Sequence, residues 1–236
     1  MDQEPGNSGK RLSRREISEA VHDLGWRYVL GVVRTSVPVA SLTQAAEVAA
    51  RAVAAAGDGG EVSLWMDLRR DRVVLTLQSP ATGWVTPLEI ELAHRISAVV
   101  SRLGLRTDAE VDSRGSRSVQ MVELAIDALD IAAIRPFWKA VMGYGDEAGA
   151  SGSTDPLVDP VGQGPAIWFQ QMDGPRPQRN RIHLDISVPH DEAPHRVKAA
   201  LAVGGVLLSD TRAPAFWVLA DAEGNEACVT TWQGRD

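Results

Sequence analysis

The chain has 236 residues, 44% of them apolar and 23% charged, which is the composition of a folded globular protein. Its length suffices for two domains, and no apolar run reaches the roughly 18 residues of a membrane-spanning helix. The net charge of −7 resides entirely in residues 118–236, which argues against a nucleic-acid-binding surface. A polar N-terminus and a single cysteine, Cys228, indicate neither a signal peptide nor an internal disulfide. We therefore expect a cytoplasmic protein that binds neither membranes nor nucleic acid.

The first half of the sequence predicts helices that alternate with pairs of strands. Ser13 and Glu16 have the spacing of a capping box, which opens the first helix, and Thr86 and Glu89 open the last one in the same way. The elements expected between these are strands 26–30 and 32–37, an alanine-rich helix over 41–56, and strands 62–66 and 73–78. The order α-β-β-α-β-β-α over residues 12–105 predicts an α+β sandwich.

Two segments predict no packed structure of their own. Residues 1–11 are rich in Gly, Ser and charge, and we expect a disordered lead-in. Residues 106–117 hold a single large apolar residue, Val111, and we interpret them as a linker between two domains.

The second half contains an internal repeat with a period of about sixty residues. Residues 122–126 resemble residues 182–186. A predicted helix follows each of these strands, and later strands follow in each copy. The helices are expected over about 131–142 and 192–203, and the last strands over 166–172 and 227–232. Each β-α-β-β-β copy is too small to bury a core alone, so the pair predicts one domain over residues 118–236.

Several short motifs of the first half belong together. They are Glu16-Ile17, Gly25-Trp26, Leu75-Thr76-Leu77, Gly83, Val85-Thr86, Glu89-Ile90 and Leu92-Ala93. With these motifs, residues 12–104 resemble the pterin-4a-carbinolamine dehydratase family. The resemblance implies a four-stranded antiparallel sheet that carries three helices, dehydration of a hydroxylated pterin, and assembly into dimers and tetramers.

The residues that this dehydration needs are replaced. Loss of water from a carbinolamine requires an acid for the leaving hydroxyl and a base for the ring N–H, and histidine suits both roles. The family's His-His-Pro box falls on Val62, Ser63 and Leu64, and its later histidine falls on Pro80. Glu89 stands where the family has an acid. The resemblance therefore implies a degenerate pterin site at Val62, Ser63, Pro80 and Glu89.

The second half carries two further motifs. The first is Asn180-Arg181-Ile182-His183-Leu184-Asp185, and the second is the turn Asp221-Ala222-Glu223-Gly224-Asn225. With Asp127 and Asp130 before Phe137-Trp138, they make residues 118–236 resemble the vicinal oxygen chelate superfamily, in its glyoxalase/bleomycin-resistance-like branch. The resemblance implies two β-α-β-β-β modules that form a half-barrel, whose cup holds a metal or a small ligand. Activities differ among such proteins, so the fold alone does not choose a function.

The family's four metal-ligand positions fall on Glu123, Trp168, His183 and Cys228. The indole N–H of Trp168 can only donate, and Cys228 is a soft ligand beside a hard carboxylate. We therefore expect a cup without metal or cofactor, in which His183 and Glu123 are the catalytic candidates. The residues expected to line the ligand are Trp168, Cys228, Gln170 and Trp217. Zinc held by Glu123, His183 and Cys228 is the alternative.

These observations favour a two-module small-molecule-binding protein, whose first half is a scaffold and whose second half carries the ligand. Three alternatives stay open: a lyase or isomerase that uses His183 and Glu123, a 4a-hydroxytetrahydrobiopterin dehydratase with a rebuilt site, and a protein-binding regulator. An apolar helix over 90–103 and exposed sheet edges lead us to expect a homodimer or tetramer.

Overall fold

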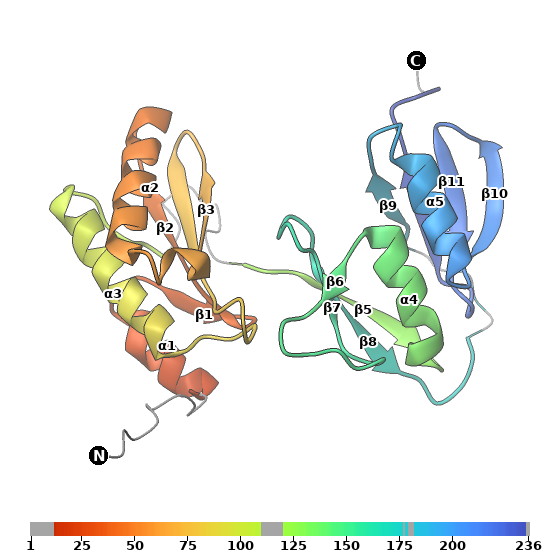
Figure 1. Cartoon of the computed structure of the whole chain (residues 1–236), viewed down its shortest axis with the longest axis horizontal. Helices are drawn as coiled ribbons and strands as arrows, with labels where there is room; N and C mark the ends of the chain where they lie inside the picture. Colours follow the sequence, from red (N-terminus) through yellow and green to blue (C-terminus); the bar gives the residue numbers. More distant parts are fainter. Residues whose placement is uncertain (1–11, 110–119, 177, 179–181, 235–236) are drawn as a thin grey trace, which may run out of the picture. The chain divides into compact units, whose positions relative to one another are not determined.

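The structure is a computed structural model, which describes residues 12–109, 120–176, 178 and 182–234. The chain divides into two compact units, Met1–Met121 and Val122–Asp236 (Figure 1). The expected lead-in over 1–11 and most of the expected linker lie outside the described residues. No helix in the described part is long and apolar enough to cross a membrane.

The first unit has the predicted order α-β-β-α-β-β-α. Its helices are α1 (Arg14–His22), α2 (Leu42–Ala56) and α3 (Pro87–Arg102), and its strands are β1 (Arg27–Val29), β2 (Val32–Pro38), β3 (Leu64–Leu68) and β4 (Arg72–Leu77). A short 3-10 turn, η1 (Glu61–Ser63), precedes β3. The strands form one antiparallel sheet in the order β1-β2-β4-β3, which confirms the α+β prediction.

The three helices of the first unit lie on one side of its sheet (Figure 1). Alternate residues of the central strands, such as Val33 and Leu75, are fully buried against helix residues that include Leu92 and Ile96. In the described part of the first unit, the other face of the sheet carries no helix. We call it the helix-free face, and it presents Arg27, Arg34, Thr76 and Trp65.

The second unit consists of the two predicted β-α-β-β-β modules. The first module contains β5 (Glu123–Ala128), α4 (Ile131–Met142), β6 (Gly145–Asp146), β7 (Leu157–Val158) and β8 (Ala166–Gln171). The second contains β9 (Leu184–Ser187), α5 (Ala193–Ala202), β10 (Val206–Arg212), β11 (Phe216–Ala220) and β12 (Glu226–Thr230). The sheet orders β5-β8-β7-β6 and β9-β12-β11-β10 are equivalent, and in each module the first and last strands pair in parallel.

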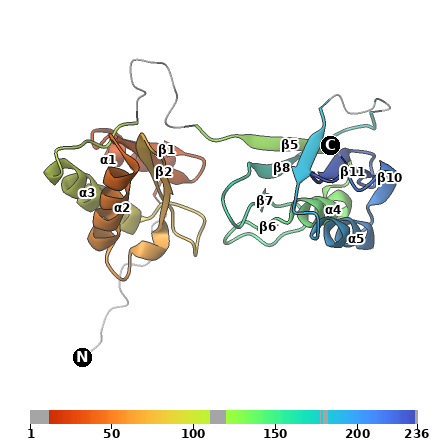
Figure 2. The same ribbon diagram turned by 90° about the horizontal axis from the view of Figure 1, so that it is seen from above.

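Helices α4 and α5 pack against each other and share one core with both sheets. Gly205, which precedes β10, permits this packing, because a Cβ there would lie only 2.6 Å from Phe137 Cδ2. In the view of Figure 2, strands β5, β8 and β11 lie on one side of the unit and the two helices lie on the other. Each sheet therefore has one face against a helix and one face turned away from it.

Candidate functional site

The candidate site is the face of the second unit's two sheets that points away from α4 and α5, which we call the cup face. Strand residues alternate between the two faces. The residues in the helix-packed core include Ile126, Ile167, Phe169, Ala227 and Val229. The cup face therefore consists of the alternate positions, which are Glu123, Ala125, Asp127, Ala166, Trp168 and Gln170 in the first module, and His183, Asp185, Ser187, Glu226, Cys228 and Thr230 in the second.

In the first module, the cup face presents a flat aromatic side chain among polar ones. Trp168 is 36% exposed and lies opposite Ala125 in the parallel β5–β8 ladder. Gln170 lies opposite Asp127, whose Oδ2 is 3.0 Å from Nη1 of Arg176. Glu123 is exposed at the start of β5. This half of the face offers a stacking surface with hydrogen-bonding groups beside it.

In the second module, the cup face carries polar side chains that are shielded from water. Glu226, Cys228 and Thr230 follow one another along β12, and they are 8%, 6% and 4% exposed. The hydroxyl oxygens of Thr230 and Ser187 lie 2.8 Å apart across the β12–β9 ladder. Buried polar groups normally have a hydrogen-bonding partner, as Thr230 has in Ser187.

Five of the residues expected in the cup lie on this face. Glu123, Trp168 and Gln170 share the face of the first module, and His183 and Cys228 share that of the second. No hydrogen bond or ion pair joins His183 to Glu123 in the part of the chain that the structure describes.

Trp217 lies on the other face of β11. It is opposite Val229 in the β11–β12 ladder and packs against the core. Its neighbours Phe216 and Val218 occupy the cup face instead, opposite Thr230 and Cys228.

Sequence reasoning also missed three polar cup residues, Asp185, Ser187 and Glu226. Asp185 lies directly opposite Cys228, and Ser187 opposite Thr230. Glu226 comes one position before Ala227, and His183 one position before Leu184; Ala227 and Leu184 are the first pair of the β9–β12 ladder. Side chains two residues apart in a strand share a face. Residues 226 and 230 could therefore have been placed on the face of Cys228, and residues 185 and 187 on the face of His183.

Metal ligation has little support in the geometry. Within the described ranges, no three His, Cys, Asp or Glu side chains are grouped so that they could hold a metal ion. Glu123, His183 and Cys228, the trio considered for zinc, thus do not form such a group there.

The turn between β11 and β12 has a structural role. Asp221 is 2% exposed, and its Oδ1 accepts hydrogen bonds from the backbone N–H groups of Glu223 and Asn225, both at 2.9 Å. Its Oδ2 accepts from the Asn225 amide and from the indole N–H of Trp138 on α4, again at 2.9 Å. The turn is therefore closed and anchored by one buried carboxylate.

Glu223 in the same turn reaches the first module. Its carboxylate accepts hydrogen bonds from the backbone N–H of Leu129, at 2.8 Å, and of Asp130, at 2.6 Å. These groups lie in the connection between β5 and α4. The motif therefore holds the two modules, and with them the two halves of the cup face, in one arrangement.

In the first unit, the positions of the degenerate pterin site do not assemble acid–base machinery. Glu89 is fully buried, and its Oε1 accepts from the Ser63 hydroxyl at 2.8 Å. Its Oε2 accepts from the backbone N–H and the hydroxyl of Thr86, at 2.7 and 2.6 Å. Val62 is 60% exposed and Pro80 is exposed. The carboxylate thus serves as the cap of α3.

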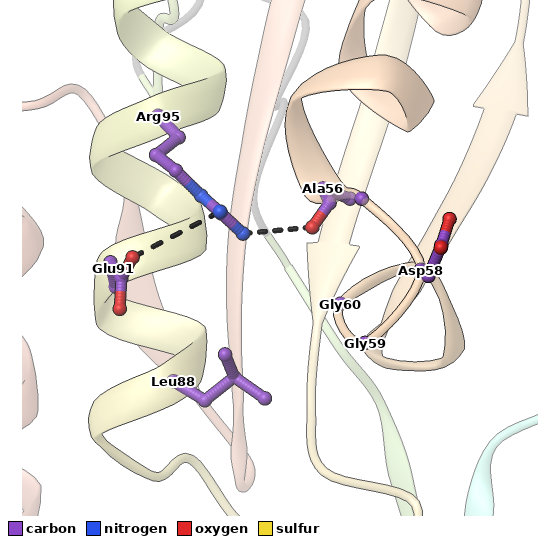
Figure 3. A pocket seen from close by; sticks show the side chains of 8 residues that line it. Ala56, Asp58, Gly59, Gly60, Leu88, Glu91 and Arg95 are labelled. Atoms are coloured by element: carbon purple, nitrogen blue, oxygen red, sulfur yellow. Dashed lines mark hydrogen bonds and ion pairs between the residues drawn. The ribbon is translucent and has the colours of Figure 1, made fainter.

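A separate shallow hollow of about 380 Å³ lies between the end of α2 and the first half of α3 (Figure 3). Arg95 crosses it and donates from Nη2 to the carbonyl oxygen of Ala56 at 2.8 Å. Arg95 therefore caps the C-terminus of α2, where a positive charge is favourable. The remaining residues of the hollow include Leu88, Glu91 and the turn 57–60, and none of them is a histidine, cysteine, serine or threonine.

Comparison with known proteins finds a match for the second unit. Residues 123–230 match the family model described as a glyoxalase-like domain. No curated protein matches the chain.

Solved structures resemble each unit separately. A glyoxalase/bleomycin resistance protein from Albidiferax ferrireducens T118 is 15% identical over 47% of this chain and 97% of its own, with a TM-score of 0.37. A glyoxalase/bleomycin resistance protein/dioxygenase family enzyme from Burkholderia phytofirmans PsJN is 17% identical over 48% and 98%, with a TM-score of 0.36. A transcriptional coactivator/pterin dehydratase from Brucella melitensis is 26% identical over 38% and 98%, with a TM-score of 0.35.

Proposed function

Because residues 123–230 form a glyoxalase-like domain, we propose that the second unit binds a small organic molecule on its cup face, without a metal. The observation that carries this proposal is that the cup face, which no helix in the described part of the unit covers, combines the exposed ring of Trp168 with polar side chains such as Gln170 and Asp185. Ligand sites typically combine apolar walls with a few convergent polar groups, and this face has both.

The chemistry of the face suits a ligand that is at least partly planar. Trp168 offers an exposed ring for stacking, and Phe216 and Val218 extend the apolar surface of the second module. Directional contacts come from Glu123 and His183, both of which are exposed to an incoming molecule.

The first unit serves as a scaffold in this proposal. Its pterin-site positions hold Val62, Ser63 and Pro80 in place of histidines, and its acid, Glu89, is committed to capping α3. A dehydratase with a rebuilt site would need a base that the described residues around Glu89 do not supply.

The test is a thermal-shift screen of the full chain with a library of planar organic compounds, followed by calorimetric titration of any hit. We expect His183→Ala and Trp168→Ala each to weaken binding of the hit at least tenfold while the protein stays folded. The matched control is His195→Ala, since His195 is an exposed histidine on α5. Equal weakening by the control, or unfolding by His183→Ala without any hit for the wild type, would show that the face is not a ligand site.

A lyase or isomerase reaction on the same face is the second candidate. The observation that favours it is that His183 and Glu226 each come immediately before the first residue pair of the β9–β12 ladder, Leu184 with Ala227. An imidazole next to a carboxylate is a common acid–base arrangement. Mass spectrometry of a hit after incubation distinguishes the two: conversion that His183→Ala abolishes supports an enzyme, and an unchanged ligand supports a binding protein.

A further inference from the structure

One guanidinium in the first unit lacks the partners that its position requires. Arg34 lies on β2, a central strand, and is half-buried on the helix-free face. Its Nε is the one side-chain nitrogen or oxygen atom in the described part of the chain that is buried without a hydrogen-bond partner. Such atoms are rare in native proteins, because burial without a partner costs free energy.

The neighbour of Arg34 makes its position less favourable still. Arg27 on β1 lies directly opposite it in the antiparallel ladder. Like charges at opposed positions destabilise a sheet. Arg27 donates from Nη1 to two backbone carbonyl oxygens, those of His22 and Trp26, so its charge is not neutralised by a carboxylate in the described structure.

The carboxylates nearest in the sheet are already occupied. Asp67 on β3 pairs with Arg69, whose Nη2 lies 2.8 Å from Asp67 Oδ2. Asp108, which bridges to the backbone of Ser36, pairs with Arg106 at 2.7 Å. The pair Arg27–Arg34 is therefore a positive site whose counter-charge must come from outside the described residues or from a ligand.

An exposed aromatic ring lies in the same cross-strand row. Arg34 pairs with Thr76 of β4, and Thr76 pairs with Trp65 of β3. Trp65 is 49% exposed. Neighbouring strands are about 4.8 Å apart, so Arg34 and Trp65 are about 10 Å apart along the row, roughly the length of a bicyclic ring with one substituent.

We propose that the helix-free face of the first unit binds a small planar aromatic anion. Its carboxylate or phosphate would lie on Arg27 and Arg34, where planar guanidinium groups match such oxyanions. Its ring would stack on Trp65, with Thr76 between the two ends of the site. This site is separate from the cup face and does not depend on the function proposed for it.

The experiment is calorimetric titration of the full chain with 2-naphthoate, which carries a carboxylate, and with adenosine monophosphate, which carries a phosphate. The comparison shows which of the two anionic groups the site prefers. We expect at least one probe to bind, neutral 2-naphthamide not to bind, and inorganic phosphate to bind more weakly than the favoured probe. Arg34→Met should weaken binding roughly 10- to 100-fold, the range expected for losing hydrogen bonds to a charged group. Trp65→Ala should weaken it several-fold.

The matched control is Arg70→Met, which removes the same charge from an exposed turn and should change affinity less than twofold. His183→Ala on the cup face should leave binding of the probe unchanged. Arg34→Met keeps the apolar stem of the side chain, so we expect its ligand-free Tm to equal or exceed that of the wild type. Arg34→Lys, which keeps the charge but loses the planar fork, should also weaken binding.

Four results would overturn the proposal. The first is no binding of either probe, and the second is an equal loss of affinity in Arg34→Met and Arg70→Met. The third is a single-stranded oligonucleotide that binds far more tightly than adenosine monophosphate, which would assign the face to a nucleic acid. A lower Tm for Arg34→Met together with unchanged affinity would show that Arg34 has a packing role only.

Discussion

At the scale of single residues, the carboxylate of Glu223 is one of the contacts that join the two modules of the second unit. We expect Glu223→Ala to destabilise the protein by about 1–2 kcal/mol, because the N–H groups of Leu129 and Asp130 lose a charged acceptor but remain accessible to water. Chemical denaturation of the full chain measures this. The control is Asp191→Ala, an exposed acid of the same unit; an equal loss of stability in the control would contradict the role of Glu223.

A second residue, Asp159, provides a prediction about pH. Burial by itself would raise the pKa of Asp159, but backbone N–H groups of Gly164, Val161 and Gln163 donate to its carboxylate, and the resulting pKa lies below the ordinary value of 3.8. A depressed pKa means that the ionised form stabilises the folded state at all pH values above the unfolded pKa. That stabilisation is lost as the pH falls through the folded pKa.

The measurement compares thermal unfolding of the wild type and Asp159→Asn between pH 6 and pH 3. We expect the wild type to be more stable at pH 6 and the difference to shrink below about pH 4. Other acids titrate in both proteins and cancel in the comparison. A difference that does not change with pH would show that the hydrogen bonds of Asp159 do not depend on its charge.

At the scale of elements, Glu89, the residue at the acid position of the degenerate pterin site, caps the start of α3. Glu89→Ala should cost about 2–4 kcal/mol, since it leaves the buried Ser63 hydroxyl and the Thr86 N–H without their acceptor. Glu91→Ala, two residues later on the exposed side of α3, should cost less than about 0.5 kcal/mol. Urea unfolding of both variants checks this. Equal effects would mean that the cap contributes little.

Several elements were predictable because their signals are local. The capping boxes at Ser13 and Thr86 fix where α1 and α3 begin, and the structure has both. Strands β6 and β7 have only two residues each and follow from pairing with β8, so no local pattern marks them. The helix boundaries could therefore be predicted from the sequence, whereas the short strands could be identified only from the assembled sheet.

The cup face was predictable to the extent that the repeat defines it. A shift of sixty residues relates Glu123 to His183 and Trp168 to Cys228. The two-residue period of the strands places Glu123 and Trp168 on one face of the first module, and His183 and Cys228 on one face of the second. The phase of β11 was not predictable, because Phe216 and Trp217 are both aromatic and either could face the core. The register of β10 also has bulges that no sequence pattern shows.

At the scale of the whole molecule, each unit has a hydrophobic core of its own. We expect a fragment of residues 120–236 to fold and to keep any ligand binding of the cup face. If the first unit supplies the contacts for assembly, the full chain should be a dimer or larger and the fragment a monomer. Light scattering with size-exclusion chromatography measures both. A full chain that is monomeric at micromolar concentration would contradict the expected assembly.

The bonds from Glu223 to Leu129 and Asp130 also set an order of events during synthesis on the ribosome. Leu129 lies 94 residues before its acceptor, so the connection between β5 and α4 emerges long before the turn that completes it. Contacts between such distant residues form late and slow the folding of a domain. The face of α4 that packs against α5 therefore stays unburied until α5 has been synthesised.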